Sequence, residues 1–188
     1  MYGGHFYFCG TLQLMTRKEL KLTFHVVDTP EGLDGEDRRL FSRAVEAKET
    51  AHAPYSHFRV GAALLLENGE VVTGSNQENI AYPSGLCAER VAMFAAAAQY
   101  PGVAMVALAV ATDHEVDEGG EAPTPHGTSE TEAQADTISP CGGCRQVMVE
   151  YERKQARPLR VLCGASEGPI TISDDAGSLM PLAFWSQL

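Results

Sequence analysis

Three of the five cysteines lie in two short segments, and their type and spacing could hold a metal ion. One segment runs from Cys87 to Arg90 (CAER) and the other from Pro140 to Arg145 (PCGGCR). Each leads into a run of helical character, so we expect the thiols in the first turns of two helices. Unpaired backbone N–H groups and the positive end of the helix dipole favour thiolate there. Two such turns facing each other would offer three sulfurs to a soft divalent metal.

This ligand set predicts a zinc ion, one per chain, bound by Cys87, Cys141 and Cys144. Zinc with three protein ligands and an open fourth position is typical of a catalytic site, because the metal lowers the pKa of a bound water. Two other interpretations stay open at this point. A closed structural site would need a fourth thiolate ligand, and a thiol redox module would use Cys141 and Cys144 as a reducible pair.

Length and composition indicate a single soluble globular domain. The chain has 188 residues, of which 44% are hydrophobic and 21% are charged, within the ordinary range for such proteins. We find no apolar stretch long enough to span a bilayer, and residues 1–14 lack the basic and apolar regions of a signal peptide. An odd number of cysteines without such a signal favours a cytoplasmic location over a disulfide-bonded extracellular protein. Met15 is an alternative start, which would make residues 1–14 a dispensable extension.

Most of the negative charge belongs to one stretch of the chain. Eight acidic residues and no Lys or Arg lie between Asp113 and Asp136, and removing these eight charges from the formal charge of −11 leaves −3. The stretch is too poor in apolar residues to fold alone, so we predict a mobile, solvated acidic loop over residues 113–138. The remainder still lacks the basic surface that a nucleic-acid-binding protein needs.

The elements before the first cysteine segment should form a helix and a hairpin. Residues 20–27 suit a short extended segment, and Asp34 should cap a helix whose buried stripe includes Leu40 and Ala44. Residues 58–66 and 71–75 read as strands joined by Asn68-Gly69, a strong hairpin signal. We therefore divide the chain into an N-terminal extension and lead-in, residues 1–33, and one domain, residues 34–188.

Three further strands complete the predicted sheet. Residues 103–111 are almost continuously apolar, which suits a strand buried on both faces. Residues 159–163 and 170–173 are separated by a link too short for a helical crossover, so these last two strands should be antiparallel. The pattern predicts an α/β protein with a mixed five-stranded sheet and helices on its faces.

Four segments carry a resemblance to the zinc-dependent cytidine deaminases of nucleoside salvage, in their homotetrameric branch. They are residues 53–63 (APYSHFRVGAA), 74–79 (GSNQEN), 87–90 (CAER) and 140–146 (PCGGCRQ). Their order agrees with the zinc deaminase signature of a ligand, a catalytic Glu two residues later, and P-C-x-x-C. A cysteine at position 87 in place of histidine favours free nucleosides over nucleic acid as substrates. The resemblance implies a three-layer α/β/α cytidine deaminase-like fold.

The same resemblance implies roles close to the reacting atoms. Glu89 would take a proton from water, pass it to the ring nitrogen and protonate the leaving amine. Arg90 would donate hydrogen bonds to the zinc-bound sulfurs and offset their charge, with Arg145 as a second candidate for that role. Phe58 would pack on the base, while the backbone N–H of Ala88 would donate to the base carbonyl.

Sugar binding and subunit assembly are implied in the same way. Asn76 and Glu78 match the positions that bind ribose hydroxyls, which suits an amide and a carboxylate. Tyr82 and Phe184 match positions that neighbouring subunits contribute, so the resemblance implies a homotetramer with shared active sites. The partners would be small nucleosides, with neither nucleic acid nor membrane.

The predicted function is hydrolytic deamination of cytidine and deoxycytidine to uridine and deoxyuridine, with release of ammonia, in pyrimidine salvage. One alternative is deamination of another aminated pyrimidine nucleoside of the antibiotic type, because Ile80 stands where the family usually has a small residue. Another is a non-catalytic, zinc-stabilised protein. The ordinary nucleoside is favoured because the Asn76 to Asn79 segment is intact.

Overall fold

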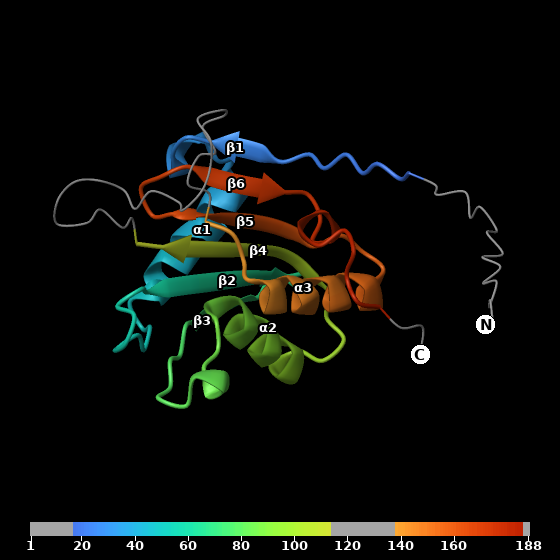
Figure 1. Ribbon diagram of the computed structural model, residues 1–188. Helices are drawn as coiled ribbons and strands as arrows, with labels where there is room; N and C mark the ends of the chain where they lie inside the picture. The colour runs from blue at the N-terminus through green and yellow to red at the C-terminus, as the bar shows by residue number, and fades with distance from the viewer. Residues whose placement is uncertain (1–16, 114–137, 186–188) are drawn as a thin grey trace, which may run out of the picture.

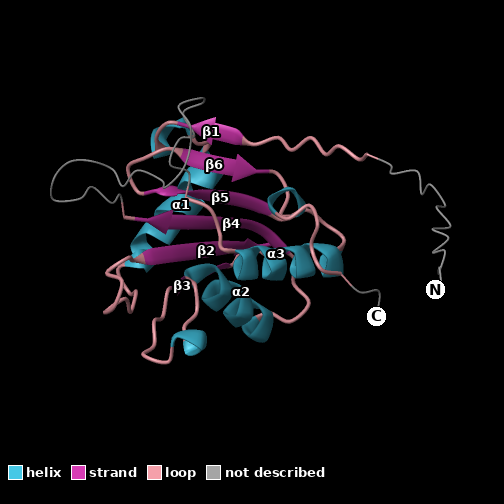
Figure 2. Ribbon diagram, in the orientation of Figure 1, coloured by secondary structure: helices cyan, strands magenta, loops and turns pink. Residues whose placement is uncertain are grey.

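The computed structural model describes residues 17–113 and 138–185. Met15 and residues 114–137 of the predicted acidic loop lie outside the described residues. The described part forms one mixed sheet with helices on both faces, the three-layer arrangement expected from the sequence (Figures 1 and 2).

The sheet has the strand order β1-β6-β5-β4-β2-β3. Its single parallel pair among the described strands is β4 with β5, and the other neighbours are antiparallel. The predicted hairpin of β2 and β3 and the antiparallel last two strands are confirmed. The strands are β1 (His25–Val27), β2 (Val60–Leu66), β3 (Val71–Ser75), β4 (Met105–Thr112), β5 (Arg160–Ala165) and β6 (Ile170–Ser173).

The predicted count of five strands was wrong, because the described residues form a sheet of six. The additional strand is β1, which lies in the residues expected to be a lead-in. It pairs antiparallel with β6, placing His25 opposite Ile172 and Val27 opposite Ile170. The sequence predicts an extended segment there but no partner, because the pairing joins chain segments far apart in sequence. A three-residue strand carries too little periodicity to identify its neighbour.

In the part of the chain that the structure describes, three α-helices cover the sheet: α1 (Gly35–Lys48) packs on one face, and α2 (Ala88–Gln99) and α3 (Gly142–Gln155) pack on the other (Figure 1). The predicted cap at Asp34 is confirmed, since its Oδ1 accepts from the backbone N–H groups of Glu36 at 3.0 Å and Asp37 at 2.9 Å. Residues 17–113 and 138–185 also contain three short 3-10 turns: η1 (Pro30–Gly32), η2 (Tyr82–Ser84) and η3 (Gly177–Leu179).

Two glycines let the helices approach the hairpin closely. A Cβ added to Gly61 in β2 would lie 2.1 Å from the carbonyl oxygen of Ala44 in α1, and one added to Gly74 in β3 would lie 2.6 Å from the backbone nitrogen of Ala92 in α2. Side chains at these positions would push the helices away from the sheet. The start of α2 is therefore held at a fixed distance from the hairpin.

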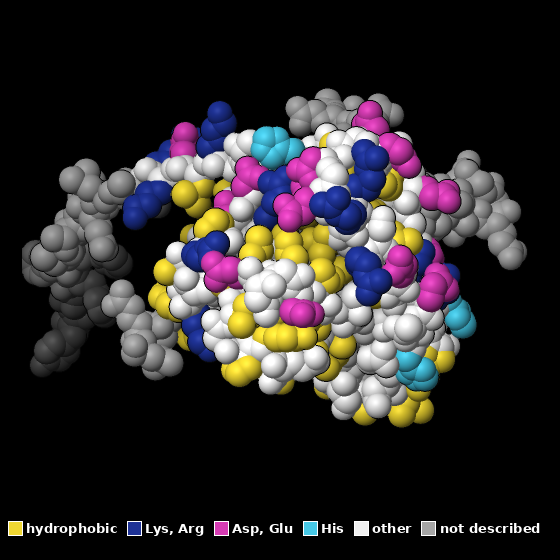
Figure 3. Space-filling model, turned by 180° about the vertical axis from the view of Figure 1, so that it is seen from behind, with side chains coloured by type: hydrophobic (Ala, Val, Ile, Leu, Met, Phe, Trp, Pro, Cys, Tyr) yellow, Lys and Arg dark blue, Asp and Glu magenta, His cyan; other side chains and the backbone are white. Residues whose placement is uncertain are grey.

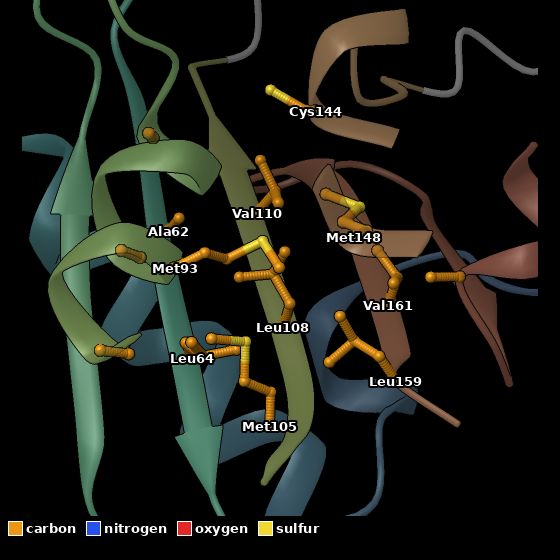
Figure 4. Packing of buried hydrophobic residues seen from close by; sticks show 14 of the residues in the cluster. Ala62, Leu64, Met93, Met105, Leu108, Val110, Cys144, Met148, Leu159 and Val161 are labelled. Carbon is orange, nitrogen blue, oxygen red and sulfur yellow. The ribbon is translucent and has the colours of Figure 1, made fainter. Parts of the chain in front are cut away.

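Each face of the sheet has its own apolar core. The α1 side is built from residues such as Phe41, Ala109 and Leu162, and the α2–α3 side includes Met93, Leu108 and Met148. Cys144 belongs to this second core and lies near its edge, beyond Val110 (Figure 4). The cysteine cluster thus adjoins the apolar core directly.

The outer surface carries charges of both signs. Arg160 in β5 pairs with Asp37 and Asp174, for example, and on the face seen from behind Lys and Arg side chains are interspersed with Asp and Glu (Figure 3). Within the described residues, none of the helices is long and apolar enough to cross a membrane.

Candidate active site

The three predicted ligands meet where two helices begin. Cys87 is the N-cap of α2 and Cys141 is the N-cap of α3, and Cys144 follows in the first turn of α3. Their sulfurs lie within 4.8 Å of one another, with 3.8 Å between Cys87 and Cys141 and 3.5 Å between Cys141 and Cys144. Cys87 is half-buried, Cys141 exposed and Cys144 buried. The cluster therefore opens to solvent on one side and closes against the core on the other.

This donor set fits zinc. Tetrahedral zinc with Zn–S bonds of about 2.3 Å requires sulfurs about 3.8 Å apart, which is close to the distances of the Cys141 sulfur from those of Cys87 and Cys144. The described residues place no fourth Cys, His or carboxylate in the same group. Cys87, Cys141 and Cys144 would therefore hold the metal and leave one position facing the open side.

Negative charge in the cysteine cluster lies next to an arginine. Contact with the Cys144 thiol, supported by Arg90, lowers the pKa of Cys87 to about 5. The same contact, together with burial, raises the pKa of Cys144. Arg90 donates from Nη2 to the Cys87 sulfur at 3.4 Å, which raises the pKa of the guanidinium further. A thiolate at Cys87 beside a cation is a ready ligand for a divalent metal.

Glu89 lies beside this cluster, two residues after Cys87, and is almost completely buried. Its residue exposure is 4%, and burial raises the pKa of its carboxyl group above the ordinary value. It lines the same cavity as Cys87 and Cys141. A buried carboxyl group with a raised pKa can both accept and return a proton near neutral pH.

A cavity of about 680 Å³ leads from the surface to these groups. Its walls come from the loop before β2, the loop after β3, the start of α2 and the segment before α3. Most of the predicted site residues line it, namely Phe58, Asn76, Glu78, Tyr82, Cys87, Glu89, Arg90 and Cys141. The fold thus brings residues from all four motif segments to one space.

Glu78 is held firmly at the cavity wall. Its Oε2 accepts from the backbone N–H of Tyr55 at 2.9 Å and of Ser56 at 3.3 Å, and its Oε1 accepts from the Ser56 hydroxyl. These bonds, that from the Ser56 hydroxyl foremost, lower the pKa of Glu78. The carboxylate is therefore kept charged and fixed in orientation.

Asn76 has a structural role in addition to its predicted contact with the sugar. Its Nδ2 donates to the carbonyl oxygen of Phe58 at 2.8 Å, and its Oδ1 accepts from the backbone N–H of Val60 at 2.8 Å. The amide thus holds the start of β2 against the loop after β3. One N–H and one lone pair of the amide remain for a ligand.

Other predicted residues lie outside the cavity wall. Ala88 is fully buried, so its side chain packs in the core and its backbone N–H lies at the start of α2. Phe184 is 79% exposed and is held through its backbone by the Gln146 amide. Ile80 is 81% exposed and does not belong to the lining.

Arg145 does not contact the sulfurs, which corrects its candidacy as a sulfur donor. Its guanidinium donates to the carbonyl oxygens of Pro140 at 2.7 Å and Leu179 at 3.2 Å, and to the Ser139 hydroxyl at 2.8 Å. Arg145 directly follows Cys144, so it projects about 100° further round the helix. It ties the segment before α3 to the C-terminal segment.

Several lining residues escaped the sequence analysis. Val110 and Thr112 come from the central strand β4, and residues 138–140 form another part of the wall. Apolar strand residues give no functional signal by type. Tyr55 and Ser56 did lie inside a quoted motif segment, and that position was the signal that could have found them.

Comparison with known proteins agrees with this geometry. Residues 34–157 match the family model described as the cytidine and deoxycytidylate deaminase zinc-binding region. The cytidine deaminase of Halalkalibacterium halodurans is 40% identical over 151 residues, which cover 79% of this chain and 93% of that protein. The cytidine deaminase of Mycobacterium tuberculosis is 37% identical over 112 residues, or 60% of this chain and 68% of that protein.

Solved structures give the same result. The cytidine deaminase of Burkholderia pseudomallei superposes with a TM-score of 0.60 at 38% identity, covering 78% of this chain and 97% of that chain. That of Mycobacterium tuberculosis has a TM-score of 0.55 at 31% identity, covering 82% of this chain and 99% of that chain. The chain therefore belongs to the cytidine and deoxycytidylate deaminase family, and it is a zinc-binding deaminase.

Proposed function

We propose that this protein hydrolyses cytidine and deoxycytidine to uridine and deoxyuridine, releasing ammonia. The observation that carries the proposal is a buried carboxyl group, Glu89, lining the same cavity as two of the three clustered cysteines. Displacing an amine from an aromatic ring at neutral pH needs an activated water and a group that carries protons between water, ring and amine. Both requirements can be met at this point of the cavity.

The proton steps fall to Glu89. When bound, zinc supplies the Lewis acidity that makes water a usable nucleophile at neutral pH. Glu89 would accept the proton that this water loses and deliver it to the ring nitrogen adjacent to the reacting carbon. It would then move the second proton to the departing amine, so that one water and one nucleoside give the oxo product and ammonia. The raised pKa of Glu89 supports this exchange.

The positive charge of Arg90 would serve the metal rather than the substrate. Three thiolates on a divalent ion carry a net charge of −1, which weakens the acidity of a water bound there. The hydrogen bond from Arg90 to Cys87 draws charge away from the sulfur. Such outer contacts tune metal sites without touching the reacting atoms.

The base and the sugar would be recognised by different walls. Phe58 would pack on the ring, and the backbone N–H of Ala88, unpaired by position in the first turn of α2, would donate to the base carbonyl,. Glu78 would bind sugar hydroxyls together with the N–H and the lone pair of the Asn76 amide that make no bond within the protein. A charged, fixed carboxylate suits a neutral hydroxyl donor.

The charge of the wall favours a nucleoside over a nucleotide. Among the described residues that line the cavity, Arg90 is the one with a cationic side chain, and it is bonded to Cys87. A 5′-phosphate would enter a space that contains Glu78 and Glu89 without a cation of its own, which is unfavourable.

Assembly into a homotetramer forms part of the proposal. Tyr82 is 77% exposed at the cavity, and Phe184 is 79% exposed on the C-terminal segment that Gln146 of α3 holds. Both side chains are therefore available to a neighbouring copy. We also assign the enzyme to pyrimidine salvage in the cytoplasm, where reduced thiols remain available for zinc.

The test is ammonia release by zinc-loaded protein supplied with cytidine, deoxycytidine or cytidine 5′-monophosphate. We expect turnover of both nucleosides and a kcat/KM at least about 100-fold lower for the monophosphate. Zinc-loaded protein without activity on either nucleoside would refute the proposal. It would then direct attention to another aminated pyrimidine nucleoside or to a non-catalytic zinc protein.

A further inference from the structure

We propose that Ser56 is a positioning residue that couples the sugar-binding carboxylate to the base-binding aromatic ring. The inference rests on the proposed function, because it assumes that Glu78 and Phe58 contact a nucleoside. These two residues are far apart in the sequence: Phe58 comes from the loop before β2 and Glu78 from the loop after β3, and the two loops meet at the open end of the hairpin. Their relative placement therefore depends on what links the two loops.

The Ser56 hydroxyl makes two bonds of opposite sense. It donates to Oε1 of Glu78, and its oxygen accepts from the backbone N–H of Phe58 at 3.0 Å. A hydroxyl group can do both at once, because it has one donor and two acceptor lone pairs. One side-chain atom thus joins the carboxylate of Glu78 to the backbone of Phe58.

The bonds to Glu78 leave little freedom for its carboxylate. Oε2 receives two backbone N–H groups, from Tyr55 and Ser56, and Oε1 receives the Ser56 hydroxyl. Of the roughly four lone-pair sites on a carboxylate, about one on Oε1 stays free. Ser56 therefore determines which direction Glu78 offers to a ligand.

The opposite side of Phe58 is held independently. Its carbonyl oxygen accepts from Asn76 Nδ2 at 2.8 Å, and the preceding His57 adopts a left-handed conformation with φ of 59°. That turn allows the Ser56 oxygen to reach the N–H two residues later. Phe58 is consequently fixed from both backbone sides, by Ser56 on one and Asn76 on the other.

Removing the hydroxyl should weaken substrate binding without disturbing the metal or the proton carrier. In Ser56→Ala we expect KM for cytidine to rise about tenfold, with kcat within about twofold and zinc content unchanged. Ser56→Thr keeps a hydroxyl and should restore KM to within about threefold of the parent. Ser42→Ala, on the exposed side of α1, is the matched control and should leave both constants unchanged.

A double-mutant cycle separates positioning from a general loss of structure. Glu78→Ala should lower kcat/KM about 100-fold, and adding Ser56→Ala to it should cost about threefold or less. The same tenfold loss in both backgrounds would overturn the coupling, as would an unchanged KM in Ser56→Ala. Parent protein inactive on cytidine would instead refute the proposed function, and Glu78→Ala with parental KM would refute the assumed sugar contact.

Discussion

The starts of α2 and α3 resemble each other locally and differ in what they do. Each begins at a cysteine N-cap with extended backbone and no side-chain cap bond, and each is followed by an arginine within four residues. At α2, Arg90 contacts the sulfur of Cys87. At α3, Arg145 turns to Pro140, Ser139 and Leu179. Residues three and four positions apart both lie on one side of a helix, so the difference between the two arginines comes from the acceptors that each one meets rather than from spacing.

Glu89 of α2 and Glu152 of α3 differ in the same way as the two arginines, since one lies at the cysteine cluster and the other binds backbone groups. Glu89 in α2 is buried at the cavity. Glu152 in α3 accepts backbone N–H groups from Leu159 at 2.9 Å, Ala176 at 2.7 Å and Gly177 at 3.0 Å. In the proposed mechanism the start of α2 supplies the group for proton transfer, whereas Glu152 of α3 anchors the chain at Leu159, Ala176 and Gly177.

The strongest test of this division removes a ligand from the α3 side. Cys144→Ser should abolish zinc retention and reduce ammonia release below detection, because two thiolates cannot hold zinc in place. Metal analysis after dialysis checks the first effect and the ammonia assay checks the second. Cys163→Ser is the matched control, since this thiol is equally buried but lies outside the cluster. Zinc retained by Cys144→Ser would contradict the assigned ligand set.

A smaller effect should distinguish the two arginines. Arg90→Gln should lower kcat about 10- to 100-fold with moderate loss of stability, because it removes the cation next to Cys87. Arg145→Gln should leave kcat within about threefold but reduce the free energy of unfolding by about 2 kcal/mol, since it removes charge-assisted bonds to backbone oxygens.

Steady-state kinetics and chemical denaturation of the two zinc-loaded variants provide the comparison. If Arg145→Gln lost as much kcat as Arg90→Gln at equal zinc content, the Arg145 side chain would have a role in the chemistry. The division between the helices would then be wrong.

The smallest effect should come from an ion pair that lies away from both helix starts. Lys48, with 7% side-chain exposure, pairs with Asp113 at the end of β4 and donates to Ser166 at 2.9 Å. Arg59 also donates to Asp113, at 3.0 Å. Burial opposes ionisation of Asp113, but the bonds from Lys48 and Arg59 outweigh it and lower the pKa of Asp113.

Because the folded-state pKa is depressed, this stabilisation is present above the unfolded value of about 4 and is lost as pH falls through the folded value. Asp113→Asn should therefore reduce the free energy of unfolding by about 1 kcal/mol at pH 7, a figure discounted because Asp113 is 32% exposed,. Denaturation at pH 7 and at pH 3 measures the difference. A destabilisation that grew on acidification would contradict the assignment.

The sequence predicted well those features that depend on residues close together along the chain. The Asp34 cap, the Asn68-Gly69 hairpin and the cysteine-led helix starts follow from short-range preferences, and the structure has all of them. The sulfur cluster could be predicted because the two cysteine segments match the zinc deaminase signature, in which a Glu follows the first ligand by two residues and P-C-x-x-C supplies the other two ligands.

Features that depend on contacts between distant segments could not be predicted in this way. The pairing of β1 with β6 and the contacts of Arg145 are set by tertiary packing rather than by residue type. The hydrogen bond from the Tyr55 backbone N–H to Glu78 and that from Asn76 to the Phe58 carbonyl oxygen are of the same kind. Nearly every residue has the same backbone groups, so the sequence does not identify which of them a side chain contacts. The location of Glu78 and Asn76 inside motif segments indicated that both residues are important, but it did not predict which backbone groups they contact.

The central claim is that Glu89 transfers the protons, whereas Glu152 of α3 has a structural role. The most direct measurement is ammonia release from cytidine by zinc-loaded Glu89→Gln beside zinc-loaded Glu152→Gln. We predict that Glu89→Gln loses at least about 1,000-fold in kcat with zinc still bound, whereas Glu152→Gln keeps kcat within about threefold and unfolds at lower denaturant. Zinc-loaded Glu89→Gln with kcat within tenfold of the parent would contradict the account.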